Sequence, residues 1–201
     1  MSFLPESSAF ILPLAMFAFV SSVTPGPNNS MLATSSANHG VRATLPHMLG
    51  ISVGFAAMLL IVAAAAGSFL ALFPTVAPIV RWGGGVWILW LAWQIATAPP
   101  ESDGGPRNIL GFFGAMAFQW VNPKGWMIAI AVATEFARPD LPLIPQLILI
   151  GIVFIGVSIP CMLPWIALGR WVGGAMRRSG RLRAFNIAMG VLLGVSVVPL
   201  L

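Results

Sequence analysis

Charged side chains are scarce in this sequence. Only 7% of its 201 residues are Asp, Glu, Lys or Arg, whereas an ordinary soluble domain is close to one quarter charged. Hydrophobic residues make up 58%, and the mean hydropathy is +0.93. Apolar runs of about 20 residues recur along the whole chain, which is the length that spans a bilayer. The composition therefore predicts an all-α integral membrane protein and excludes an ordinary soluble domain.

Residues that commonly act as catalysts or metal ligands are also few. The single cysteine, Cys161, excludes an intrachain disulfide, and two histidines and five acidic residues form no recognisable metal-ligand pattern. No Ser-His-Asp set, phosphate loop or zinc motif is present. We therefore expect no metal, no cofactor and no enzyme; an intramembrane enzyme is the alternative that these absences disfavour.

The basic residues point to a membrane surface. The net charge of +5 would suggest nucleic acid as a partner for a soluble protein. Half of the ten basic residues, however, fall between Arg170 and Arg183 in one loop, where they can set topology and contact anionic lipids. We expect membrane lipids and no nucleic acid among the partners.

Hydropathy predicts six transmembrane segments in a single transmembrane domain, residues 1–201. They cover about 10–38, 44–68, 76–97, 109–136, 143–168 and 185–201. The stretch 99–107, PPESDGGPR, is the clearest linker because it is rich in Pro, Gly and charge. It separates two pseudo-repeats of three segments each, 1–98 and 108–201.

The loop arginines predict the orientation. Loops one, three and five carry seven arginines, and the opposite side carries only Arg81 and Arg138. Cytoplasmic loops are enriched in Lys and Arg, so loops one, three and five are expected in the cytoplasm and both termini outside.

The first and fourth segments are each interrupted near the middle by a polar residue followed by proline. The pairs are Thr24-Pro25 and Asn122-Pro123, and each lies in the first segment of its half. Because each half has an odd number of spans, the second half enters the membrane in the opposite sense, as an inverted repeat. Matched interruptions in two halves point to a binding site near the midplane, with simple proline kinks as the alternative.

Each interruption predicts a helix stop followed by a new helix. Thr24 and Asn122 are good N-cap residue types, and proline at the first helical position costs little. The new helices should therefore begin at Pro25 and Pro123.

The new helix starts should be anion sites. Backbone N–H groups are expected to be open at Gly26, Asn28, Lys124 and Gly125, and helix N-termini attract negative charge. Irregular backbone at membrane depth is tolerated only where protein or a water-filled cavity lines it. We therefore expect a polar cavity near the midplane.

Lys124 is the only lysine in the chain and lies deep within the fourth segment. Ionisable residues at such depth are costly and usually functional. No acidic residue inside any segment is available to pair with it, since Glu135 sits at the end of the fourth segment. Lys124 could bind a substrate carboxylate, or it could be neutral at rest and carry a proton. After the first break, Asn28 is favoured for the site and Asn29 for helix–helix contact.

Three pairs of glycines four residues apart predict close helix packing. They are Gly50 and Gly54, Gly169 and Gly173, and Gly190 and Gly194. The last pair could alternatively form the face of a homodimer.

Other polar and aromatic residues are assigned lesser roles. His39 and His47 are expected to be solvated around the first cytoplasmic loop, with pH gating as the alternative. Trp120 and Trp126 flank the second break and could line the cavity.

Three stretches of the chain resemble the LysE/RhtB family of bacterial amino-acid exporters. They are TPGPNNSMLATSSANHGVRATLPHMLGISVGF (24–55), WILWLAWQIATAP (87–99) and FQWVNPKGW (118–126). Within the family, the PNN and SSANHG forms are most similar to the cysteine and O-acetylserine exporter branch. One departure is ATEF at 133–136, where the family often has PQF; it places Glu135 at the outer end of the fourth segment.

The resemblance implies efflux of a small amino acid or derivative across the bacterial inner membrane, driven by proton exchange. The termini would then be periplasmic. A channel-like or non-transporting membrane subunit is the alternative. By motif position, with Asn29 added from the pattern of the break, the substrate-binding candidates are Thr24, Pro25, Gly26, Pro27, Asn28, Asn29, Asn122, Pro123 and Lys124.

Overall fold

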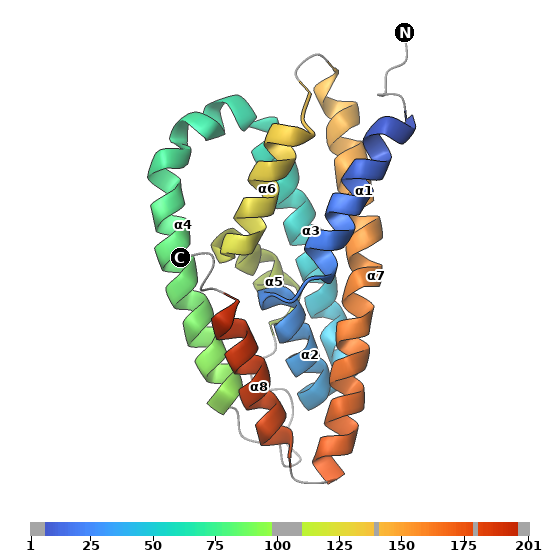
Figure 1. The fold of residues 1–201 in the computed structure, drawn as a ribbon, viewed down its shortest axis with the longest axis vertical. Coiled ribbons are helices and arrows are strands. Elements are labelled where there is room, and N and C mark those ends of the chain that lie inside the picture. Colours follow the sequence, from blue (N-terminus) through green and yellow to red (C-terminus); the bar gives the residue numbers. More distant parts are fainter. Residues whose placement is uncertain (1–6, 98–109, 139–140, 179–180, 197–201) are drawn as a thin grey trace.

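The computed structural model describes residues 7–97, 110–138, 141–178 and 181–196. Every regular element in these ranges is a helix, as the composition predicts (Figure 1). The elements are α1 (Ser7–Val23), α2 (Pro27–His39), α3 (Val41–Ala64), α4 (Ala66–Thr97), α5 (Phe112–Phe118), the 3-10 helix η1 (Gln119–Val121), α6 (Pro123–Glu135), α7 (Leu143–Arg178) and α8 (Leu182–Val195).

Both predicted interruptions are present. The axes of α1 and α2 are bent by 52° where the chain passes through the first break. The second break separates α5 and η1 from α6. The helices therefore stop and restart at the two proline motifs, as the sequence indicates.

By length and composition, two helices among the described residues can cross a membrane, α3 and the part of α7 that runs from Leu143 to Ala175. The bent pair α1–α2 makes a third if it is counted as one span. The apolar stretches Phe112–Val121 and Leu182–Val195 are shorter. The six-span count therefore stays a prediction. The 99–107 linker and the end of the sixth segment lie outside the described residues.

Corresponding helices of the two halves run in opposite directions (Figure 1). The pair α1–α2 runs from the end nearest the N-terminus to the far end, while α5 to α6 runs back. Likewise α7 runs opposite to α3, and α8 runs opposite to α4. Antiparallel correspondence of this kind is what an inverted repeat requires.

Several helices are longer than the predicted segments. Only Ala65 separates α3 from α4, which begins ten residues before the expected start at 76. The helix α7 continues through Pro160 and Pro164 as far as Arg178. Hydropathy marks where a segment stops being apolar, whereas a helix continues for as long as its backbone hydrogen bonds persist.

Glycines bring neighbouring helices into close contact, as their spacing predicts. A Cβ added to Gly169 would lie 2.8 Å from the carbonyl carbon of Ala33, and one added to Gly54 would lie 2.5 Å from the Cα of Met116. The same holds for Gly190, where a Cβ would lie 2.6 Å from the carbonyl oxygen of Ala92. Gly190 thus packs α8 against α4 of the same chain, and a homodimer stays a prediction.

The helix α2 is polar yet buried among α3, α7 and α8. Its buried polar residues are Asn29, Ser30, Thr34, Ser35, Ser36 and Asn38. The Ser36 hydroxyl donates to the carbonyl of Ile166 on α7 at 2.8 Å. The amides of Asn38 and Asn186 of α8 exchange two hydrogen bonds, at 2.9 and 3.2 Å. These pairings stabilise a polar helix in the interior, where unpaired polar groups would be costly.

Candidate functional site

Thr24 ends α1 and does not cap α2. Its hydroxyl donates to the carbonyl of Ser21 at 3.2 Å, and α2 begins only at Pro27. The predicted helix start at Pro25 is therefore wrong. The residue before a proline avoids the helical region, and Gly26, which precedes Pro27, is extended with φ 174° and ψ −178°. Two prolines spaced by one residue thus delay the new helix until the second.

The second break forms as predicted. Asn122 caps α6: its side-chain oxygen accepts a hydrogen bond from the backbone N–H of Lys124 at 3.1 Å, and Pro123 occupies the first turn. This bond corrects one expectation, since the Lys124 N–H is satisfied within the chain and is not open to a ligand.

The two breaks meet at the Lys124 ammonium. Its Nζ donates to the Thr24 hydroxyl at 2.8 Å, the Thr24 carbonyl at 3.2 Å and the Pro25 carbonyl at 3.3 Å. An ammonium has three donors. In the part of the chain that the structure describes, all of its partners are neutral oxygens of the other break, and no carboxylate pairs with it.

A reciprocal amide pair joins the breaks a second time. Asn28 Nδ2 donates to Gln119 Oε1 at 2.9 Å, and Gln119 Nε2 donates to Asn28 Oδ1 at 3.2 Å. Gln119 is fully buried and also donates to the carbonyl of Ala115. Sequence reasoning missed Gln119, although a glutamine within an apolar segment three residues before a break is a usable signal.

Asn29 closes the end of α1. Its side-chain amide donates to the carbonyls of Ser22 and Thr24 at 2.8 and 2.9 Å. Asn29 therefore links α2 back to α1 across the first break, which is the contact role that the sequence favoured for it.

A cavity of about 50 Å³ lies where the breaks meet. Its lining residues are Ser21, Ser22, Gly26, Pro27, Asn28, Asn29, Ile51, Ser52, Phe55, Asn122, Lys124, Gly125, Ile128, Ser158 and Met162. Of the predicted site residues, Thr24 and Pro25 reach it through their bonds to Lys124, and Pro123 is not among the lining residues. The four lining serines were missed, although each is a hydroxyl within an apolar segment.

The cavity is smaller than an amino acid. A water molecule occupies about 30 Å³ in the liquid, so the cavity has room for one or two waters. Pockets that hold small molecules usually measure about 300–1,000 Å³. A substrate can therefore enter only if the helices that carry the two breaks separate.

The tryptophans beside the second break do not line this cavity. The indole N–H of Trp126 donates to the carbonyl of Trp120 at 2.8 Å, and the two rings meet edge to face with centroids 5.9 Å apart. Trp126 is buried in the core between α1, α3, α6 and α7. The expectation that this pair lines the cavity is wrong, because the two side chains pack against each other and the core.

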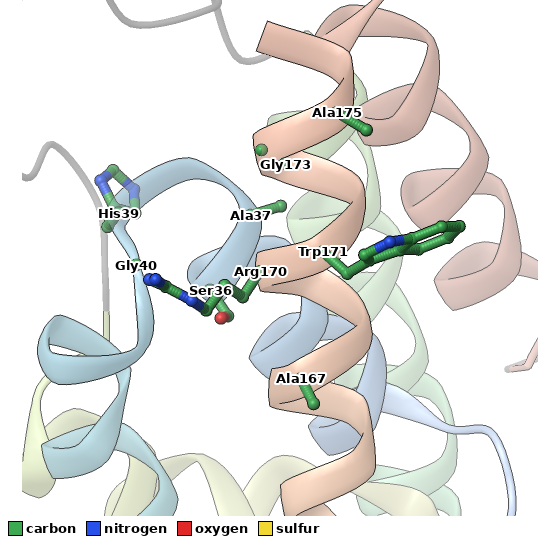
Figure 2. Close-up of a pocket in the computed structure, with 10 residues that line it drawn as sticks. Ser36, Ala37, His39, Gly40, Ala167, Arg170, Trp171, Gly173 and Ala175 are labelled. Carbon is green, nitrogen blue, oxygen red and sulfur yellow. The ribbon is translucent and has the colours of Figure 1, made fainter.

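A larger pocket of about 680 Å³ opens where the end of α2 meets α3 and α7. Figure 2 shows the Arg170 side chain extending from α7 towards Gly40, with His39 nearby. No acidic side chain is among the lining residues that the structure describes. This pocket lies at the end of the bundle where α2 and α7 finish (Figure 1).

His47 is buried and not solvated, which corrects the sequence-based expectation. Only 2% of its surface is exposed. It lies on the stripe of α3 that holds Thr44, which bonds Ser35 of α2, and Gly50, which contacts Phe112 of α5. Hydropathy places His47 at a segment end, but α3 begins at Val41 and His47 is among its buried residues.

Comparison with known proteins places this site in a transporter family. The chain is 27% identical over 177 residues to proteins named cysteine/O-acetylserine efflux protein from Escherichia coli strain K12, Shigella flexneri serotype 5b and Shigella sonnei. The match covers 88% of this chain and 90% of each relative. No solved structure matches. The family model described as LysE type translocator matches residues 19–201, so this chain belongs to the LysE type translocators and is a membrane transporter, not an enzyme.

Proposed function

We propose that this protein exports a small neutral amino acid, similar to cysteine or O-acetylserine, from the bacterial cytoplasm in exchange for protons. The observation that carries the proposal is the Lys124 ammonium, held by neutral oxygens beside a cavity where two interrupted segments meet. The relatives named cysteine/O-acetylserine efflux protein support the direction of transport and the substrate class.

The substrate carboxylate binds Lys124 in place of the first break. A carboxylate carries a full negative charge, whereas the hydroxyl and carbonyl oxygens of Thr24 are neutral, so the carboxylate attracts the Lys124 ammonium more strongly and competes well with Thr24. The side-chain oxygens of Asn28 and Asn122 can accept from the substrate ammonium. The lining serines, among them Ser52 and Ser158, offer partners for a polar side chain.

Substrate binding is thereby coupled to movement. When the carboxylate binds Lys124, the three bonds from Lys124 to the first break are released, and the Asn28–Gln119 amide pair still joins the breaks. The two halves can then separate around the enlarged cavity, and the site opens to the other side of the membrane. After the substrate leaves, Lys124 returns to the first break as an ammonium, and the proton that it carries back is released on the cytoplasmic side.

The protein is proposed to span the bacterial inner membrane six times, as two inverted repeats with periplasmic termini. The opposite directions of corresponding helices support the repeat, and the arginine distribution supports the orientation. The small size of the cavity favours a carrier over a channel, because a channel needs a continuous path and this site has room for only one or two waters.

Transport in vesicles tests the proposal. Labelled amino acids are added, one at a time, to the medium of everted vesicles, uptake is measured with and without a pH gradient, and counterflow is measured in proteoliposomes. Lys124→Ala is expected to lower transport at least tenfold while the protein stays folded in the membrane. Arg183→Ala, which removes an exposed cation far from the cavity, is the control and should transport normally. Normal efflux by well-expressed Lys124→Ala contradicts the assigned role, and uptake without trans-stimulation indicates a channel.

A further inference from the structure

His47 has two buried ring nitrogens without a hydrogen-bond partner. Neither Nδ1 nor Nε2 is bonded, although the side chain is 2% exposed. A neutral imidazole carries one donor and one acceptor, and leaving such groups unpaired in the interior is costly. Unsatisfied buried groups are rare in native proteins and call for a functional or hydration role.

Along α3, His47 lies between Ile51, which lines the Lys124 cavity, and Gly40, which precedes the helix and lines the larger pocket. Ile51, one helical turn further along α3, lines the Lys124 cavity together with Ser52. Residues three and four apart share a helix face and lie about 5–6 Å apart. The imidazole is therefore one turn from the cavity on one side, and one turn from Thr44 on the other.

From Thr44, hydrogen bonds lead to the larger pocket. The Thr44 hydroxyl donates to the carbonyl of Gly40 at 2.9 Å and lies 3.0 Å from the hydroxyl of Ser35. Gly40 lines the larger pocket, as does Ser36, the neighbour of Ser35 (Figure 2). Polar groups thus extend from one turn below His47 to a space that opens at the end of the bundle.

No other charged group bonds His47. The elements that pack against α3 are α2, α4, α5, η1, α6 and α7. The described titratable and charged side chains on these elements and on α3 are His39, Arg42, Lys124, Glu135, Cys161 and Arg170. Within the described part of the chain, none of them forms a hydrogen bond or ion pair with His47. His47 is therefore free to accept a proton without first breaking a bond.

We propose that His47 carries the proton between the Lys124 cavity and the pocket at the cytoplasmic end. This inference rests on the proposed function, because it assigns the proton path of that exchange. The Lys124 ammonium gives one proton, through a water in the cavity, to the neutral His47 imidazole. Once its ring has rotated to within hydrogen-bond reach of Thr44, the imidazolium passes a proton to the Thr44 hydroxyl, which passes one on to water in the larger pocket. One proton moves, Lys124 becomes neutral, and no other bond changes.

The test compares two variants with a matched control. His47→Gln keeps a polar side chain that does not titrate, and His47→Leu removes the unpaired nitrogens. Met48→Leu is the control, since it changes a buried neighbour on α3 to a similar volume without removing a titratable group. Each protein is assayed in proteoliposomes for counterflow without a pH gradient and for uptake driven by one.

Both His47 variants are expected to keep counterflow within about twofold of wild type and to lose at least tenfold of the uptake driven by the pH gradient. Gradient-driven uptake that survives in His47→Leu, or that is restored by His47→Gln, overturns the proposal and indicates a packing or hydrogen-bonding role. Absence of counterflow in the wild type overturns the proposed function itself, and this inference with it.

A spectroscopic measurement covers the case in which the variants do not fold. Wild-type protein with ¹⁵N-labelled histidine is placed in bilayers, and the ring nitrogens are followed between about pH 3 and pH 8, because burial disfavours the cationic imidazole. Of the two histidines, the buried His47 ring should change from neutral to cationic imidazole within this range. A His47 ring that stays neutral at every pH and in the presence of substrate overturns the proposal.

Discussion

Replacement of Gly169 by alanine is the sharpest test of the helix packing that supports the site. Gly169 on α7 faces the backbone of Ala33 on α2. An added Cβ would lie 2.8 Å from the carbonyl carbon and 2.9 Å from the Cα of Ala33. Optimal carbon–carbon separations are about 3.5–4.0 Å, and backbone atoms cannot rotate away as a side chain can. The two helices must therefore separate locally by about 1 Å.

Three terms set the size of the effect. Overpacking a tight interface costs about 1–3 kcal/mol. Separation also strains the hydrogen bond of 2.8 Å from the Ser36 hydroxyl to Ile166, which contributes about 1 kcal/mol. Replacing glycine by alanine within a helix raises the free energy of unfolding by about 1 kcal/mol, which offsets part of this loss. The net expectation is that the free energy of unfolding falls by about 1–3 kcal/mol.

Thermal unfolding of purified protein, followed by circular dichroism in detergent, measures the effect. Gly156→Ala is the control, because Gly156 is on the same helix and a Cβ there would have no neighbour within 4 Å. That variant should unfold at the wild-type temperature or above it, since only the helix-propensity gain applies. If Gly169→Ala proves as stable as Gly156→Ala, the close contact between α2 and α7 does not exist as described.

Three further predictions concern the breaks and the polar helix. Asn122→Ala removes the cap of α6 and should lower stability by about 1 kcal/mol, measured by the same thermal unfolding. Gly26→Ala places a Cβ 3.0 Å from the Lys124 amine; because the lysine end can shift, we expect a raised KM in counterflow with little loss of stability, and an unchanged KM would contradict this contact. Asn38→Leu leaves the fully buried Asn186 amide without its reciprocal partner and should lower the free energy of unfolding by about 1–3 kcal/mol. Replacing both asparagines by leucine leaves no unpaired amide, so the unfolding midpoint should recover most of that loss.

The broken helices were predictable because proline acts locally. A proline lacks an N–H and disfavours helix at the residue before it, whatever surrounds it, so interruptions near Pro25 and Pro123 follow from the sequence. The Asn122 cap is equally local and is confirmed. The helix α2 begins two residues later than predicted. Pro27 keeps Gly26 out of the helical region, and this outweighs the helix-starting tendency of Pro25.

Contacts between the halves were beyond prediction from one sequence. Nothing local connects Lys124 with Thr24, or Gln119 with Asn28, since about 90–100 residues separate each pair along the chain. The same reason explains why the burial of His47 was not predicted. It depends on α2 and α5 packing against α3, whereas hydropathy alone places His47 at a segment end.

The sequence by itself determined that this is an all-α membrane protein, where its helices break and which glycines let helices approach. Composition, proline and glycine act through the solvent and the backbone, so their effects need no knowledge of distant residues. Only the tertiary structure decided that the two breaks face each other, that Lys124 is held by neutral oxygens, and that the cavity between them is small. These depend on how two halves of the chain pack, because a buried charge takes whichever partners the packing brings to it.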